Sequence, residues 1–157
     1  MSFNRRQFLK GAVTSVTALP VLKAYASNHV PFMHGVASGD PLSDRVILWT
    51  RITPSNDPLF TGALLPYRWE IALDPAMGMV INSGAGMTGP EVDYTVKVDA
   101  DQLQPGTTYY YRFYSNGIDS PIGRTKTLPV EHVDRLRIAF CSCSNYPMGF
   151  FNVYREI

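Results

Sequence analysis

Two cysteines near the C-terminal end are the residues of this 157-residue chain best suited to chemistry. Cys141 and Cys143 lie two positions apart in an apolar run that predicts a strand, so both side chains point to the same face. A disulfide at this spacing is strained, and a Cys-x-Cys metal or redox motif is weak without further Cys or His. Cys143 does end the strand, where ligands of α/β folds gather. Spacing alone nevertheless favours structural or free thiols over metal ligands.

The cysteines belong to a predicted strand–loop–helix unit at residues 136–157. Residues 136–143 are nearly apolar throughout, as in a strand that is covered on both faces, and the polar sequence 144–147 interrupts the run. Apolar side chains then follow at helical spacing, namely Phe150, Val153, Tyr154 and Ile157. This pattern is typical of the first strand and helix of an α/β domain, whose sheet needs further parallel strands. We therefore expect the sequence to contain only the beginning of that domain.

Residues 27–128 predict an all-β domain, a sandwich of the immunoglobulin or fibronectin type III kind, and residues 129–135 a linker. Short strand candidates recur between turn sequences, at 32–37, 45–52, 67–73, 79–82, 94–99, 109–114 and 121–128. About seven strands is the number expected for such a sandwich. Tyr109, Tyr111 and Phe113 share one face at a period of two. Leu103, placed before Tyr109, resembles the tyrosine corner of these sandwiches, in which the hydroxyl bonds to upstream backbone.

Three other features of this domain could suggest a ligand site. Trp49 and Trp69 lie within predicted strands, and packing in the core is the favoured role for both. The aromatic run 109–114 could form a sugar-binding platform, although strand alternation turns half of it inward. His34 has no second His or carboxylate at ligand spacing, which favours a structural role.

The first 26 residues predict an export signal. Arg5, Arg6, Phe8, Leu9 and Lys10 are followed by a short apolar run over 11–22 and by the small residues Ala24 and Ala26, which indicate cleavage after Ala26. A membrane-spanning helix needs ~20 apolar residues, and the run over 11–22 is shorter, so a stable membrane anchor is not expected. The residue directly after Ala26 is not a Cys, so a lipid anchor at the cleavage site is not indicated. The Arg-Arg-x-Phe-Leu-Lys string resembles the twin-arginine consensus. The resemblance implies transport of the folded chain by the twin-arginine translocation machinery to the periplasm or the medium.

The distribution of charge excludes one class of partner. The formal net charge is +1, and residues 1–26 carry +4 without any acidic residue, so the remainder carries −3. Because nucleic-acid-binding domains carry a basic patch or stripe, this mildly acidic remainder does not indicate a nucleic-acid partner.

Three stretches of the chain together resemble the PhoD-type alkaline phosphatases, the alkaline phosphatase D family. They are the twin-arginine leader, the sequence FMHGVASGDP at 32–41 with RVILWTR at 45–51, and FCSCSNY at 140–146 with GFF at 149–151. The resemblance covers nearly the whole chain but only the front of such enzymes. It implies an exported enzyme with an N-terminal sandwich that hydrolyses phosphate monoesters and diesters in a larger domain containing iron and calcium.

The resemblance assigns a role to one cysteine. Cys143 matches the Cys of the family's Phe-x-Ser-Cys strand end, which is an iron ligand, whereas no role carries over to Cys141. The family's other ligands come from later strands without a counterpart here, and a phosphatase metal site needs several converging ligands. We therefore expect this chain to bind no metal and to be inactive alone, so that a phosphate ester substrate requires the missing domain. The alternatives are a stand-alone secreted sandwich that binds glycan or protein, and a small Cys-x-Cys redox protein, which requires an accessible thiol of depressed pKa.

Overall fold

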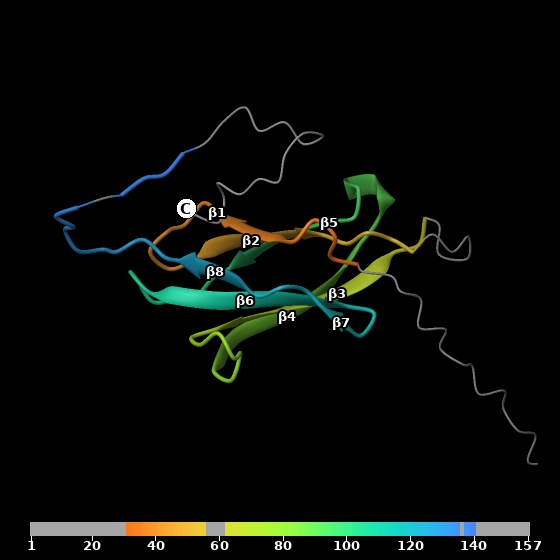
Figure 1. Ribbon diagram of the computed structural model, residues 1–157, viewed down its shortest axis with the longest axis horizontal. Helices are drawn as coiled ribbons and strands as arrows, with labels where there is room; N and C mark the ends of the chain where they lie inside the picture. Colours follow the sequence, from red (N-terminus) through yellow and green to blue (C-terminus); the bar gives the residue numbers. More distant parts are fainter. Residues whose placement is uncertain (1–30, 56–61, 136, 141–157) are drawn as a thin grey trace, which may run out of the picture.

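The computed structural model describes residues 31–55, 62–135 and 137–140, and the strands among them form an all-β sandwich of two antiparallel sheets lying face to face (Figure 1). The smaller sheet has the order β1-β2-β5, with β1 at Val36–Gly39, β2 at Val46–Arg51 and β5 at Thr95–Ala100. The larger sheet has the order β4-β3-β6-β7, with β8 also paired to β6. Its strands are β3 (Leu65–Ala72), β4 (Val80–Thr88), β6 (Thr108–Ser115), β7 (Ile118–Asp119) and β8 (Gly123–Lys126).

The predicted all-β sandwich is confirmed, with some differences in the individual strands. The first strand begins at Val36 rather than Phe32, because residues 31–34 form a turn that is closed by a hydrogen bond from the Gly35 amide to the Phe32 carbonyl. The short edge strand expected at 79–82 is β4, which continues to Thr88. The final strand is shorter than the predicted 121–128, and β7 was not predicted. Asn116 and Gly117, both at positive φ, form the tight turn between β6 and β7.

Strict alternation of side chains directs the core residues inward. Every second residue of β2 and of β6 is buried, so that Leu48, Tyr109, Tyr111 and Phe113 lie between the sheets. The rings of Tyr111 and Phe113 meet edge to face, with their centroids 6.3 Å apart. Tyr109, Tyr111 and Phe113 therefore share one face, as predicted from the sequence, and the structure shows that this face is the buried one.

The tyrosine corner is present at the start of β6. The Tyr109 side chain is fully buried, and its hydroxyl accepts a hydrogen bond of 2.7 Å from the backbone amide of Gln104. Leu103 is buried beside it in the same core cluster. The bond ties the loop that precedes β6 to the body of the sandwich, which confirms the expected link from Tyr109 to upstream backbone.

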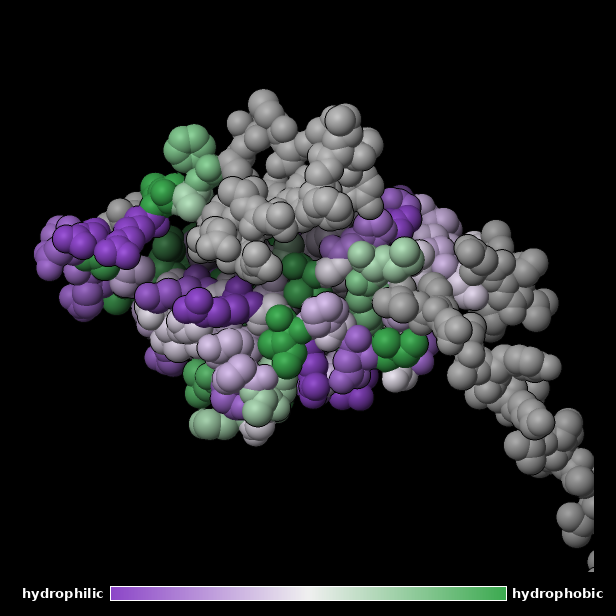
Figure 2. Space-filling model, in the orientation of Figure 1, coloured by the Kyte–Doolittle hydropathy of each residue, from purple (hydrophilic) through white to green (hydrophobic). Residues whose placement is uncertain are grey.

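The chain leaves the sandwich after β8 as an exposed segment. Residues 129–135 have no strand or helix, and Figure 2 shows them as a mostly hydrophilic projection at one side of the sandwich. Residues 137–140 form no strand, and Ile138 and Phe140 are 76% and 92% exposed. The described part of the predicted α/β unit is therefore not a covered strand, and residues 141–157 of that unit lie outside the described residues. Among the described residues, no helix is long and apolar enough to cross a membrane.

Candidate functional site

A network of charged side chains and one tyrosine covers the outer face of the larger sheet. It forms because Glu70 of β3 pairs with Arg112 of β6, and Arg68 with Tyr114, so that all four side chains leave the sheet on the same side. The Tyr114 hydroxyl donates to Glu70 Oε2. Arg112 contacts Glu70 at 3.4 Å and Asp119 of β7 at 3.4 Å, and Arg68 lies 3.6 Å from Glu70.

Tyr114 is the centre of this network. The guanidinium carbon of Arg112 lies 4.8 Å from the Tyr114 ring centroid and that of Arg68 lies 5.5 Å from it, which are favourable cation–π distances. Partial burial and then the hydrogen bond to the Glu70 carboxylate raise the pKa of Tyr114 to about 12. The neutral phenol donates its hydrogen bond to the Glu70 carboxylate.

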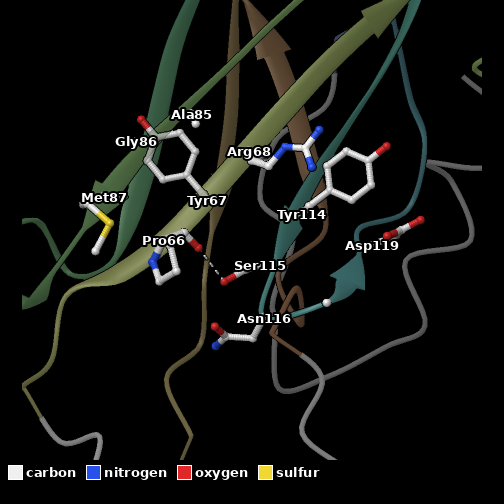
Figure 3. Close-up of a pocket in the computed structure, with 11 residues that line it drawn as sticks. Pro66, Tyr67, Arg68, Ala85, Gly86, Met87, Tyr114, Ser115, Asn116 and Asp119 are labelled. Carbon is white, nitrogen blue, oxygen red and sulfur yellow. Dashed lines mark hydrogen bonds between the residues drawn. The ribbon is translucent and has the colours of Figure 1, made fainter.

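A hollow of about 600 Å³ opens beside the network, between β4, β3 and the turn that follows β6 (Figure 3). Its apolar wall includes Pro66, Tyr67 and Met87, and its polar groups include Arg68 and Asp119. The figure shows the Arg68 and Tyr114 side chains beside each other, projecting from neighbouring strands. An aromatic ring next to hydrogen-bonding groups is suited to recognising a polar ligand or a protein surface.

The network has no arrangement that would carry out hydrolysis. Two guanidinium groups and two carboxylates balance in charge, and the described contacts pair each acid with an arginine. Across residues 31–55, 62–135 and 137–140, no three His, Cys, Asp or Glu side chains are placed to hold a metal ion together. Within the described residues, the network is therefore a set of paired charges around Tyr114.

A second ion pair, between Arg51 and Asp93, lies at one end of the smaller sheet and also contacts His34. Arg51 of β2 binds both carboxylate oxygens of Asp93, at 2.8 and 3.1 Å, and its third guanidinium nitrogen lies 3.1 Å from His34 Nε2. The hydrogen bond from Arg51 lowers the pKa of Asp93. His34 therefore lies in the turn before β1, not within the first strand, and its contact with Arg51 agrees with the expected structural role.

The two tryptophans have different positions. Trp69 is buried in the core cluster, as expected from the sequence. Trp49 is only half-buried and lies on the outward-facing side of β2, because the alternate residues Leu48 and Thr50 occupy the inward side. The predicted core position is thus wrong for Trp49. Within the aromatic run, Tyr110 and Tyr114 lie on the outer face of the larger sheet, and Tyr114 belongs to the network.

The remaining residues predicted for a site lie outside the described residues. They are the metal candidate Cys143 with its neighbour Cys141, and the signal residues Arg5, Arg6, Phe8, Leu9, Lys10, Ala24 and Ala26. The sequence reasoning in turn missed Glu70, Arg112 and Asp119. Alternation along the strands at 67–73 and 109–114 places Glu70 and Arg112 on outward positions, but only the register of β3 against β6 shows that they meet.

Known proteins match this chain over most of its length. The family described as PhoD-like phosphatase, N-terminal domain, matches residues 16–129. Alkaline phosphatase D of Bacillus subtilis (strain 168) is 39% identical over 174 aligned residues, covering 99% of this chain and 30% of the relative. The solved structure of PhoD is 40% identical, with a TM-score of 0.70 over 83% of this chain and 26% of that chain. This chain thus spans less than a third of the length of either relative.

Both the extent and the level of these matches exceed what a shared sandwich fold would produce. The family match includes all eight strands of the described residues, and the identity to alkaline phosphatase D extends along nearly the whole chain. The resemblance inferred from the three sequence stretches is confirmed: the chain belongs to the PhoD-like phosphatase family, whose N-terminal domain it contains.

Proposed function

We propose that this chain is the export signal and N-terminal sandwich module of a secreted, metal-dependent phosphatase that hydrolyses phosphate monoesters and diesters. The observation that carries the proposal is the 39% identity to alkaline phosphatase D, which covers 99% of this chain but 30% of the relative. In this proposal the matched portion comprises a leader at 1–26, the sandwich at 27–128, a linker at 129–135 and the first residues of the following unit at 136–157. In this proposal the catalytic machinery belongs to the part of such an enzyme that follows the sandwich.

The metal site is proposed to take only one ligand from this chain. Cys143 would supply a thiolate to iron, and thiolates suit transition metals, whereas calcium prefers oxygen ligands that the described sandwich does not bring together. When bound, such metals polarise a phosphoryl oxygen and activate water. A single sulfur donor holds neither ion in place, so we expect the 157-residue chain alone to bind no metal and to hydrolyse no phosphate ester.

A chimeric enzyme tests this division of labour. Residues 1–157 would replace the matching 30% of Bacillus subtilis alkaline phosphatase D, and turnover of a phosphate diester would be measured with added iron and calcium. The chimera should be active, Cys143→Ala should lose both bound iron and turnover, and the matched control Cys141→Ala should retain both. Turnover by the 157-residue chain alone, or iron that stays bound to it through dialysis, would contradict the proposal.

Export through the twin-arginine pathway is a separate part of the proposal. The chain would be expressed in a bacterium, and its amount in the periplasm and the medium would be compared for the wild type, for Arg5→Lys with Arg6→Lys, and for the control Lys10→Arg. The double change keeps the positive charge but removes the arginine pair, so export should be lost, while the control should be exported and cleaved after Ala26. Unchanged export of the double variant would refute the assigned route.

A stand-alone secreted binding module is the alternative, and the hollow beside Tyr114 is the observation that favours it. In this case the chain itself would bind a soluble glycan through Tyr114 and Arg68. Titration calorimetry with oligosaccharides would then show binding that Arg68→Ala weakens, whereas the phosphatase module is expected to show no such binding.

A further inference from the structure

β4 is a long strand at the edge of the larger sheet, and among the described strands it is the long edge strand without charged side chains. β4 runs for nine residues, Val80–Thr88, without an Asp, Glu, Lys or Arg, and the described strands pair with it only on its β3 side. The other edges are guarded: β5 carries Lys97 and Asp99, β8 carries Arg124 and Lys126, and β1 and β7 have only four and two residues. Proteins normally blunt exposed edges by such charges or by short strands.

The backbone of β4 directs its free polar groups outward at alternate residues. The Pro66 carbonyl accepts a hydrogen bond of 2.9 Å from Ser115 Oγ on the β6 side, so it points away from β4, and its register partner Met87 must point away from β3 (Figure 3). The Ser83 amide agrees with this alternation, because it donates to the side chain of the neighbouring Asn82. Ala85, between Ser83 and Met87, therefore also presents its amide and carbonyl to the outside.

The side chains along β4 are suited to burial. Met79, Val80, Ile81 and Met87 are between 43% and 59% exposed, which gathers apolar surface on this one strand and its preceding turn. Gly84 and Gly86 leave room for the side chains of Trp69 and Tyr67, since a Cβ at Gly84 would lie 2.5 Å from the Trp69 ring and a Cβ at Gly86 would lie 2.6 Å from the Tyr67 hydroxyl. The edge is thus uncharged and lined by apolar side chains, with an irregularity near Val80, where the register against β3 shifts.

We propose that β4 pairs with β4 of a second copy of this chain, in antiparallel register, to join two larger sheets across a two-fold axis at Ala85. An antiparallel pair of identical strands is itself two-fold symmetric, so each subunit offers the same surface to the other. In the register centred on Ala85, that residue pairs with its own image and Ser83 faces Met87. Because the Ser83 amide already donates to the Asn82 side chain, the outer bonds of this register run from the Met87 amide to the Ser83 carbonyl. A strand with charge at its centre would meet the same charge at the axis, and β4 has none.

The test measures the mass of the purified 157-residue chain by light scattering and sedimentation, from about 1 µM to about 500 µM. The wild type should change from monomer to dimer within this range. Ala85→Lys places two ammonium groups together at the axis, and because like charges across an interface are strongly unfavourable, dimerisation should weaken at least about tenfold. Ala85→Asp should have the same effect, and an equimolar mixture of the two variants should again form a dimer, now through a Lys–Asp pair.

Ile122→Lys is the matched control, since Ile122 is an exposed apolar residue, 46% exposed, in the connection between β7 and β8. It adds the same charge away from β4 and should dimerise like the wild type. Circular dichroism and thermal unfolding of all variants would show that the sandwich remains folded. A wild type that stays monomeric up to about 500 µM, an Ala85→Lys variant that dimerises as tightly as the wild type, or a mixture of the two variants that associates no better than either alone would overturn the proposal.

Discussion

Replacing Tyr109 by phenylalanine tests whether the tyrosine corner stabilises the sandwich through one hydrogen bond. The change keeps the buried ring but removes the oxygen that accepts the Gln104 amide at 2.7 Å. The net loss of one hydrogen bond costs about 1 kcal/mol, and leaving a partly buried amide without its partner adds a similar amount. We therefore expect the free energy of unfolding to fall by about 2 kcal/mol, within a range of about 1 to 3 kcal/mol.

Urea unfolding of the 157-residue chain, followed by tryptophan fluorescence, would measure this loss. With a slope of about 2 kcal/mol per molar for a domain of this size, the midpoint should fall by about 1 M while the slope stays unchanged. Tyr110→Phe is the matched control, because Tyr110 precedes Tyr111 on the same strand but faces outward, and its hydroxyl has no hydrogen bond within the described part of the chain. If the two variants lose the same amount, the hydrogen bond of the corner does not stabilise the fold.

Two further predictions concern β8 and the outer network. Gly123→Ala should destabilise the sandwich by about 1 to 3 kcal/mol, because the added Cβ would lie 2.2 Å from the buried Tyr111 ring, whereas Gly39→Ala, with open space around it, should cost less in the same urea experiment. Since the pKa of Tyr114 is raised to about 12, its stabilising effect is complete below pH 10 and is lost as the pH rises towards 12. The stability difference between wild type and Tyr114→Phe should therefore shrink over that pH interval, and a constant difference would show that the pKa of Tyr114 is not raised in the folded chain.

Local sequence patterns determined much of this fold. Tyr109, Tyr111 and Phe113 lie at every second position, and since strand side chains alternate between faces, the pattern predicts that they share one face. Asn116-Gly117 predicts its turn because both residues tolerate positive φ. The motif stretches also identified the family, as the matches to PhoD-like phosphatases confirm.

Contacts between distant segments decided the rest. Glu70 meets Arg112 and Tyr114 only through the register of β3 against β6, across more than forty residues of chain, which no local period encodes. Which side of β2 faces the core likewise depends on the position of the opposing sheet. The strand that contains Trp49 was therefore predicted, but the outward position of its side chain was not. The length of β4 is set by its pairing with β3, because a strand makes its hydrogen bonds to neighbouring strands and not within itself. Its exposure results from its position as the last strand at that end of the larger sheet.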